Sequence, residues 1–398
     1  MGAGPLSGLK VIELAHIMAG PVCGLMLADL GADVVKLEKL PGGDDSRRFL
    51  PPDIDGESAA FMMMNRNKRG IALDLKSAAG RAVARRLLTG ADVAIENYRL
   101  GTLERLGLGY DALSQDNPGL ILCEISGFGR TGPYAERAGF DLIAQGMSGL
   151  MSITGEGEGR PPVKVGAPVT DITAGILGAL GVVAALNERQ RTGLGQRVDT
   201  SLFEAGIVHS YWQSAIALAT GHSPGPMGSA HPLNAPYQAF PTADGWITVG
   251  AANQANWLRL LQVIGAPELA EDPRFADNAA RMANLDDLSR LLEARFTGAP
   301  TATWLERLEA AGVPAGPVLS VGEMHADPQA RARDMVTTVP HSQLGPVETL
   351  GLPIKLSATP GAVSRGAPLY GEHSREVLAE LGYSAAEIRS LIDQGAVQ

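Results

Sequence analysis

Cysteine is scarce in this chain of 398 residues, and so are aromatic side chains, which make up only 5%. The two cysteines, Cys23 and Cys123, are too few for the disulfide framework that stabilises small secreted domains. Both lie in segments that read as buried, which is typical of reduced cysteines in a hydrophobic core. The cysteine content therefore favours a reducing compartment, and we expect a cytoplasmic protein.

An excess of positive charge is also missing, because the formal net charge is -10 at pH 7. A nucleic-acid partner would require a strong local basic patch in so acidic a chain, and no stretch supplies one. Residues 1–10 lack the basic and apolar regions of a signal peptide, so we expect the mature protein to start here. The most apolar run, residues 172–186, is shorter than the roughly 20 residues that span a bilayer. We expect a buried helix there and no membrane partner.

Several motifs of nucleotide and metal enzymes are absent. The turn AHIMAGP, residues 15–21, lies where an α/β sheet binds its ligand, but it lacks the GxGxxG spacing that lets a dinucleotide approach the backbone. The Walker A sequence and the HExxH and CxxC motifs do not occur either. A nicotinamide dehydrogenase is therefore disfavoured, and we expect neither a metal site nor a permanently bound cofactor.

From residue 9 onward, short β-branched runs alternate with longer helical stretches. LKVIEL, GPVCGLMLADLG and ADVVKLEK form the first such unit, and the pattern recurs from IALDL at residue 71 to LILCEISGF at residue 120. Repeated βαβ units predict a mostly parallel sheet flanked by helices. The fold class that we predict is α/β, with a large open Rossmann-like domain and a smaller α+β domain.

A change of composition marks the boundary of the second domain. Residues 221–236, GHSPGPMGSAHPLNAP, concentrate glycine, proline, serine and asparagine, which is typical of a linker or an active-site loop. A hairpin follows in YQAFPTADGWITVGA, and helices come after it. We predict a large domain over residues 1–220, a small domain over residues 237–334, and a return of residues 335–398 to the first sheet.

Asp171 is the first candidate for chemistry. It opens a long apolar helix, and from this local pattern its commonest role would be that of a helix N-cap. A helix N-terminus also keeps a carboxylate ionised and offers N–H groups to a developing oxyanion. Both properties suit a nucleophile that accepts an acyl group.

The second candidate is a cluster of cations near strand ends, made up of Lys36, Lys39, Arg47, Arg48, Arg66, Lys68, Arg69 and Lys76. Such a cluster pairs with the phosphates of a ligand or forms a solvated charged face, and the sequence leaves both open. Among the seven histidines, only His16 and His231 lie in candidate active-site loops. A packed or surface position is the commoner role for each of them.

Taken together, these segments resemble the class III CoA-transferases, the family that includes formyl-CoA transferase and carnitine CoA-transferase. The likeness spans nearly the whole chain and rests on PLSGLKVIEL, AGPVCGLMLADLGADVVKLEK, NRNKRGIALDLK, ADVAIENYRLGTLERLGLGY, ISGFGRTGPYAERAGFD, GAPVTDITAG, RTGLGQRVDTSL and PLYGEHSREVLAELGY. The resemblance implies an interlocked homodimer of ring-shaped chains, with each active site at a domain or subunit junction.

The resemblance further implies that Asp171, in GAPVTDITAG, is the nucleophile. In such enzymes the aspartate forms a mixed anhydride with the acyl group of the donor. The released CoA thiolate then gives an aspartyl-CoA thioester, and the acceptor acid repeats the sequence in reverse. Carried over by position, the residues expected to contact CoA are Ile17, Ala19, Lys39, Leu73, Lys76, Asn97, Tyr98 and Arg105.

The likeness is closest, in NRNKRGIAL, ENYRLG, GLMSITG and GSAHPLNAPYQAF, to enzymes that use succinyl-CoA with glutarate or similar dicarboxylates. Met18 stands where formyl-CoA transferases carry a glutamine, which argues against formate or oxalate. We therefore expect succinyl-CoA as the donor and a dicarboxylate such as glutarate or itaconate as the acceptor. The candidates for holding its distal carboxylate are His16, Arg47, Arg66 and His231.

Two alternatives stay open. A 2-methylacyl-CoA racemase of the same fold would carry a histidine before the aspartate in the segment that reads Gly139, Phe140 and Asp141 here. Phenylalanine cannot exchange a proton, so this segment disfavours the racemase. A CoA-binding protein without turnover would keep the cation cluster and use Asp171 only as a helix cap.

Overall fold

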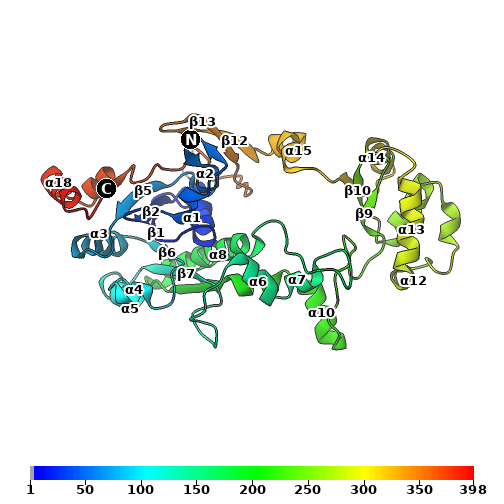
Figure 1. Cartoon of the computed structure of the whole chain (residues 1–398), viewed down its shortest axis with the longest axis horizontal. Coiled ribbons are helices and arrows are strands. Elements are labelled where there is room, and N and C mark those ends of the chain that lie inside the picture. Colours follow the sequence, from blue (N-terminus) through cyan, green and yellow to red (C-terminus); the bar gives the residue numbers. More distant parts are fainter. Residues whose placement is uncertain (1–3) are drawn as a thin grey trace. The chain divides into compact units, whose positions relative to one another are not determined.

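The computed structural model describes residues 4–398, and the chain divides into two compact units (Figure 1). Unit 1 comprises the residues up to Ser148 together with Gly166–His209 and Asp327–Gln398. Unit 2 comprises Gly149–Val165 and Ser210–Ala326. This division departs from the expected ranges, because residues 149–165 and 210–220 belong to unit 2 and residues 327–334 belong to unit 1.

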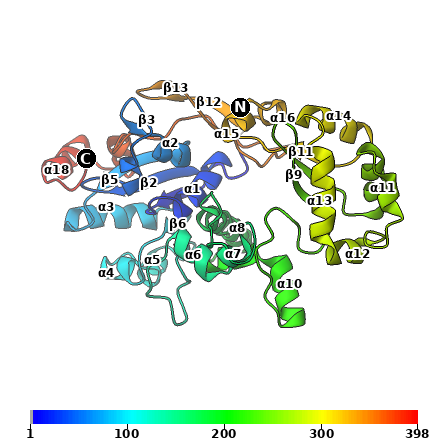
Figure 2. The same cartoon turned by 45° about the vertical axis from the view of Figure 1, so that its right-hand side comes forward.

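Unit 1 is built on a six-stranded sheet in which every neighbouring pair of strands is parallel (Figure 2). The order across the sheet is β5 (Arg69–Leu73), β2 (Asp33–Lys39), β1 (Lys10–Glu13), β6 (Val93–Glu96), β7 (Ile121–Ser126) and β8 (Arg197–Ser201). The chain therefore winds outward from β1 in one direction and from β6 in the other. Ligands of open α/β sheets bind at such a reversal, beyond the carboxyl ends of the strands. The predicted parallel α/β sheet is confirmed.

Helices cover both faces of this sheet, and successive residues of the strands enter different cores. Ile12 of β1 packs with α3 (Ala78–Thr89), α17 (Ser374–Glu380) and α18 (Ala385–Asp393). Val11, its neighbour, packs with α1 (Ala19–Asp29), α8 (Val169–Thr192) and α9 (Leu202–Val208). Alternation of this kind is the period of two of a strand, and burial on both faces explains why the strands are almost continuously apolar.

Smaller elements complete unit 1. They are η1 (Asp45–Arg48), β3 (Asp53–Ile54), β4 (Glu57–Ser58), α2 (Ala59–Asn65), α4 (Thr102–Arg105), α5 (Tyr110–Asp116), α6 (Asp141–Met147), α16 (Pro328–Ala332), β12 (Val336–His341) and β13 (Gly345–Leu350). The last two strands form an antiparallel pair of their own.

The helix expected over residues 172–186 is longer than predicted, since α8 has 24 residues. Within the described part of the chain it is the one helix long and apolar enough to cross a membrane. Its contacts are those of a core helix, because one face packs on α1, α9, β7 and β8. The opposite face leaves Ile176, Leu180 and Val183 exposed. It ends at Gly193, whose φ of 76° is the left-handed conformation that glycine adopts easily.

Unit 2 contains a three-stranded antiparallel sheet of β9 (Tyr237–Pro241), β10 (Trp246–Gly250) and β11 (Ala315–Pro317). The hairpin between β9 and β10 is where the sequence predicted it. The core contains Phe240 stacked on Phe296, and it also contains Trp257, which is fully buried and packs edge-on against Phe275. The helices of unit 2 are α7 (Leu150–Ile153), α10 (Tyr211–Thr220), α11 (Gln254–Val263), η2 (Pro267–Ala270), α12 (Asn278–Ala283), α13 (Leu285–Phe296), α14 (Thr301–Ala310) and α15 (Val321–Ala326).

Charged side chains are buried where α1 crosses the carboxyl end of β1. Glu13, Lys36 and Lys68 have no solvent exposure, and both lysines pair with the Glu13 carboxylate, at 2.9 and 2.7 Å. Gly24 of α1 lies directly against this group, and a Cβ atom at residue 24 would overlap Glu13 Oε2. The helix therefore requires glycine here so that it can pack on the sheet.

We expect Gly24→Ala to lower the free energy of unfolding by about 1–3 kcal/mol, because the new methyl group displaces a carboxylate that two lysines hold in place. An alanine in a helix with free space has the opposite effect, a gain of about 0.4–1 kcal/mol. Gly322 of α15 has such space and provides the control. Urea unfolding of Gly24→Ala and Gly322→Ala measures the expected decrease and the expected increase in the free energy of unfolding. A Gly24→Ala protein more stable than wild type would contradict the packing described.

Candidate active site

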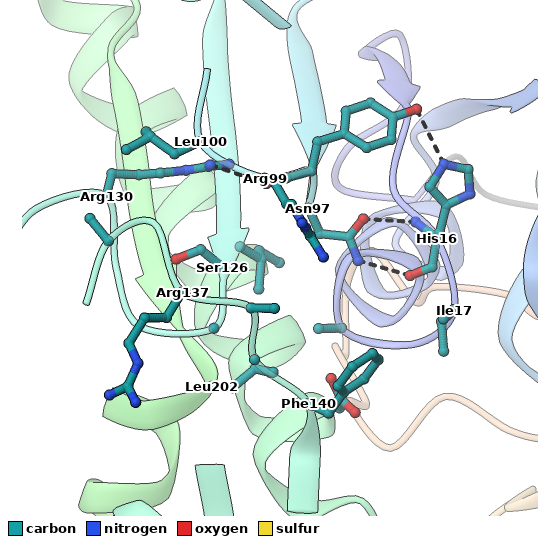
Figure 3. Close-up of a pocket in the computed structure, with 18 of the residues that line it drawn as sticks. His16, Ile17, Asn97, Arg99, Leu100, Ser126, Arg130, Arg137, Phe140 and Leu202 are labelled. Carbon is teal, nitrogen blue, oxygen red and sulfur yellow. Dashed lines mark hydrogen bonds between the residues drawn. The ribbon is translucent and has the colours of Figure 1, made fainter. Parts of the chain in front are cut away.

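A pocket of about 250 Å³ lies at the carboxyl ends of β1, β6 and β7, where the direction of winding reverses (Figure 3). It is lined by residues 16–19 after β1, residues 97–100 after β6, and residues 125–127, 130 and 135–140 of β7 and its following loop. Asp171 of α8 and Leu202 of α9 complete the wall. All of these residues belong to unit 1.

The turn after β1 is tied to the turn after β6. The His16 N–H donates to Asn97 Oδ1 at 2.9 Å, and Asn97 Nδ2 donates to the His16 carbonyl oxygen at 2.8 Å (Figure 3). His16 Nε2 lies 3.2 Å from the Tyr98 hydroxyl group. Burial, together with the charge of Lys36, lowers the pKa of His16 below its usual value. His16 is therefore a neutral hydrogen-bonding group near pH 7 and not a cation for a substrate carboxylate.

Asp171 is the third residue of α8, and the prediction that it caps this helix is wrong. The helix begins before Asp171, at Val169, with Pro168 in the N-cap position and no side-chain cap from it. Asp141 of α6 does the capping instead. Its Oδ1 accepts from the Thr170 N–H at 3.0 Å and from the Thr170 hydroxyl at 2.7 Å. The Asp171 carboxylate has no hydrogen bond or ion pair within residues 4–398 and stays available to a ligand.

The protonation of Asp171 also differs from the expectation. Burial, followed by the negative charge of Asp141, raises the pKa of Asp171 to about 7. The helix macrodipole favours the ionised form by only about 0.3–1 kcal/mol, which is less than a shift of this size requires. Asp171 is therefore close to half protonated at pH 7 in the unliganded protein.

Three arginines that the sequence analysis missed line the pocket. Arg130 is buried and paired with Glu96 and Glu124, so its charge is already balanced. Arg99 and Arg137 are exposed, and neither has a carboxylate partner among the residues that the structure describes. Arg137 stacks over Tyr134 at 4.5 Å. Two uncompensated cations thus share the pocket with Asp171. The position of Arg99, just after a strand of the predicted sheet, was the signal that could have found it.

The residues carried over from the family divide into two groups. Ile17, Ala19, Asn97 and Tyr98 line the pocket together with His16 and Asp171. Lys39 ends β2, Lys76 follows β5 at the same carboxyl edge, and Arg105 lies in α4 after β6. None of the three lines the pocket. Leu73 has a fully buried side chain in the core of unit 1, so this side chain does not reach a ligand.

Most members of the cation cluster form ion pairs within the protein, so neither of the two roles that the sequence left open, a phosphate site or a solvated charged face, describes them. Lys36, Lys68 and Arg69 are buried and paired with carboxylates. Two candidates for the distal carboxylate are engaged in the same way and lie outside the pocket. Arg47 makes two 2.7 Å contacts with Glu38, and Arg66 lies 2.6 Å from Asp29. Exposed cations at this edge are Lys39, Arg48 and Lys76.

His231 belongs to unit 2, where its ring lies 5.8 Å from Trp212 and 5.3 Å from Tyr237. Its Nδ1 accepts from the Leu233 N–H at 3.0 Å, so the histidine shapes its own loop. A role of His231 toward substrate stays a prediction.

Phe140 is a large apolar side chain at the pocket, and 66% of its surface is exposed. It precedes Asp141, in the position where the racemases considered above carry a histidine. A phenyl ring cannot take up or release a proton. The pocket thus combines a carboxylate free to react, an apolar ring and two exposed arginines, which suits attack on an anionic acyl compound better than proton exchange at an α-carbon.

Residues 6–374 match CoA-transferase family III. The chain is similar to the succinate–glutarate CoA-transferase of Agrobacterium fabrum, with 43% identity over 383 residues that cover 95% of this chain and 96% of the relative. It is also similar to the succinyl-CoA:glutarate CoA-transferase of Mus musculus, with 35% identity over 395 residues that cover 99% of this chain and 90% of the relative. The crystal structure of a CAIB/BAIF family protein from Brucella suis has a TM-score of 0.85 and 43% identity, and covers 96% of this chain and 100% of its own.

We expect Asp171→Asn to stabilise the protein at pH 8. The folded-state pKa of Asp171 is about 7 against an ordinary value of 3.8, so stability falls as pH rises from about 4 to 7 and is constant above. The shift sets an upper bound of about 4 kcal/mol, and partial access of solvent lowers it to roughly 2 kcal/mol. Urea unfolding at pH 8 and at pH 4.5 tests this. At pH 4.5 the two proteins should be nearly equal, and an equal difference at both pH values would contradict the pKa.

Proposed function

The chain belongs to CoA-transferase family III, and on this premise we propose that it moves CoA from succinyl-CoA to a free dicarboxylic acid with Asp171 as the nucleophile. The observation that carries the proposal is the carboxylate of Asp171, which lies in the pocket at the reversal of the sheet and has no hydrogen-bond or ion-pair partner among the described residues. A catalytic carboxylate needs such freedom, since a salt bridge would have to be broken before it attacks.

In the proposed reaction, ionised Asp171 attacks the carbonyl carbon of the thioester, the C–S bond breaks, and CoA leaves as its thiolate. The product is a mixed anhydride of Asp171 and succinate. The thiolate then attacks the aspartyl carbonyl, which releases succinate and leaves CoA bound to Asp171 as a thioester. The acceptor carboxylate repeats these steps in reverse and departs as its CoA thioester, and Asp171 is regenerated.

The burial of Asp171 has a use in this scheme. A poorly solvated carboxylate is a stronger nucleophile than one bound by water or by an arginine, and a reactive anhydride survives longer where water is excluded. The raised pKa is the counterpart of this poor solvation. Only the ionised fraction reacts, so protonation near pH 7 limits the rate.

The phosphates of CoA require cations in a protein whose net charge is -10. We assign this role to Lys39, Lys76 and Arg105, which end or follow strands of the sheet at its carboxyl edge. The distal carboxylate of the acceptor fits Arg99 or Arg137, which replace Arg47 and Arg66 as candidates because they line the pocket and form no ion pair within residues 4–398. The two relatives named above carry glutarate in their names, which supports a dicarboxylate as acceptor.

A homodimer is part of the proposal. The exposed face of α8 presents Ile176, Leu180 and Val183, with 48%, 63% and 39% of their surfaces accessible. An apolar face of this kind on a helix of the active-site unit is typical of a protein interface. The interlocked form of the dimer and the cytoplasmic location stay predictions.

We expect succinyl-CoA and hydroxylamine together to convert Asp171 to a hydroxamate, because hydroxylamine intercepts the activated aspartyl carbonyl. Mass spectrometry of the peptide that contains Asp171 measures the product. Asp171→Asn should show neither hydroxamate nor CoA transfer while it still binds CoA, since the change leaves the pocket intact. Transfer by Asp171→Asn at the wild-type rate would refute the assignment, and omission of succinyl-CoA is the control.

We expect glutarate to exceed butyrate in kcat/KM by about tenfold to a hundredfold, because a charge-assisted contact to the distal carboxylate contributes about 1.5–3 kcal/mol. Arg99→Gln or Arg137→Gln should reduce the value for glutarate and leave that for butyrate unchanged. A variant that lowers both values equally binds CoA or positions Asp171 instead. Equal kcat/KM for the two acids in the wild-type protein would exclude a distal-carboxylate site.

A further inference from the structure

Ile17 has a backbone conformation that isoleucine rarely adopts. Its φ is 67°, in the left-handed region where a branched Cβ crowds the neighbouring carbonyl group. A residue in this conformation is strained and persists only where its surroundings hold it. Ile17 lies in the turn between β1 and α1 and lines the pocket that contains Asp171 (Figure 3).

Asp44, in the loop after β2, makes the contact that holds Ile17. The Ile17 N–H donates to both carboxylate oxygens of Asp44, at 3.1 and 3.2 Å. The Asp44 side chain is fully buried, and Ser46 fixes it by donating from its N–H and its hydroxyl to Oδ1, at 2.9 and 2.8 Å. The carboxylate therefore cannot move without breaking contacts to three groups.

Lys36 connects Asp44 to an earlier residue of the turn. Its Nζ lies 2.9 Å from Asp44 Oδ2 and donates to the Ala15 carbonyl oxygen at 2.9 Å. Burial would raise the pKa of Asp44, but the charge of Lys36 lowers it well below its usual range. Asp44 is thus an ionised acceptor, which makes a stronger hydrogen bond to the Ile17 N–H than a neutral group makes.

The charges around this contact are balanced by ion pairs within the cluster. Glu13 pairs with both Lys36 and Lys68, so two carboxylates face two ammonium groups, and all four residues have no solvent exposure. Among the described residues, neither lysine makes a hydrogen bond or an ion pair with a residue that lines the pocket. Asp44 is the member of the cluster that does, through Ile17.

We propose that Asp44 is a positioning residue, which keeps Ile17 in its left-handed conformation and thereby shapes the wall of the pocket against which the acyl-CoA thioester binds. A relaxed Ile17 would redirect the chain before Met18 and Ala19, and both of these line the pocket. The nature of the ligand rests on the proposed function. The role of Asp44 in holding the conformation of Ile17 does not depend on the proposed function.

The first test compares two buried aspartates. Asp29 is the matched control, because it is also fully buried and ion-paired, with Arg66 at 2.6 Å, but contacts no residue of the pocket. We expect Asp44→Ala to lower kcat/KM for succinyl-CoA by about a hundredfold, the effect of a displacement of about 1 Å at a reacting group. Asp29→Ala should stay close to wild type when both are assayed below their unfolding transitions. Equal losses in the two variants would show a structural role only.

The second test is rescue by glycine, which adopts positive φ without strain. In an Ile17→Gly background the site no longer needs Asp44 to impose the conformation. The loss caused by Asp44→Ala should therefore shrink from about a hundredfold to less than about tenfold, a coupling that a double-mutant cycle measures. If Asp44→Ala lowers kcat/KM by the same factor in the wild-type and the Ile17→Gly backgrounds, the proposal is overturned.

A third measurement needs neither a folded Asp44→Ala protein nor activity. With Asp44 present, Ile17→Gly should have a Tm a few degrees above that of Ile17→Ala, because alanine keeps the strain and glycine does not. A lower Tm for the glycine variant would show that residue 17 is not held in the left-handed conformation, and this would overturn the proposal. Wild-type protein that fails to transfer CoA would count against the proposed function alone, since the Tm comparison is unaffected.

Discussion

The buried ion pairs around Glu13 set the geometry on which the site depends. They join three adjacent strands of the sheet, because Glu13 ends β1, Lys36 belongs to β2, and Lys68 immediately precedes β5. Buried pairs of this kind add little net stability, since desolvation of the charges offsets most of their attraction. In this protein the ion pairs fix the positions of the side chains that form them. A lysine that must reach Glu13, Asp44 and the Ala15 carbonyl together has one arrangement available, and the turn that carries Ile17 follows from it.

Asp171 shows the opposite use of burial. In the Glu13 cluster each carboxylate has a cation, whereas the charge that acts on Asp171 within the described part of the chain is that of a second carboxylate, Asp141. The arrangement makes the folded protein less stable at neutral pH and leaves the group ready to react. Destabilisation confined to one residue is typical of a catalytic centre, and the surrounding sheet supplies the stability that tolerates it.

The sequence predicted the sheet well because β-branched runs and helical stretches are local signals. The resemblance to the class III CoA-transferases, which rests on short segments, pointed to Asp171 and to the two turns that carry Ile17 and Asn97, and these residues line one pocket. The sequence could not separate structural cations from exposed ones. Lys36 and Lys39 lie in the same strand, and only the partners of Lys36, which are 23 and 8 residues away, decide that it is buried. The prediction that Asp171 caps α8 was wrong for the same reason, since the capping residue is distant in sequence. Asp141, which caps the helix, lies 29 residues before Thr170.

The interleaving of the two units has a consequence for how the chain is made. Strand β5 lies at the edge of the sheet, and α17 and the residues up to Val397 cover it, through contacts that include an ion pair between Arg69 and Glu380. These covering residues leave the ribosome only after the whole of unit 2 has been translated. A nascent chain thus exposes an apolar strand edge throughout that interval, the state in which strands of different chains pair most easily. Yield in a heterologous host should therefore depend on chaperones that occupy this edge during synthesis.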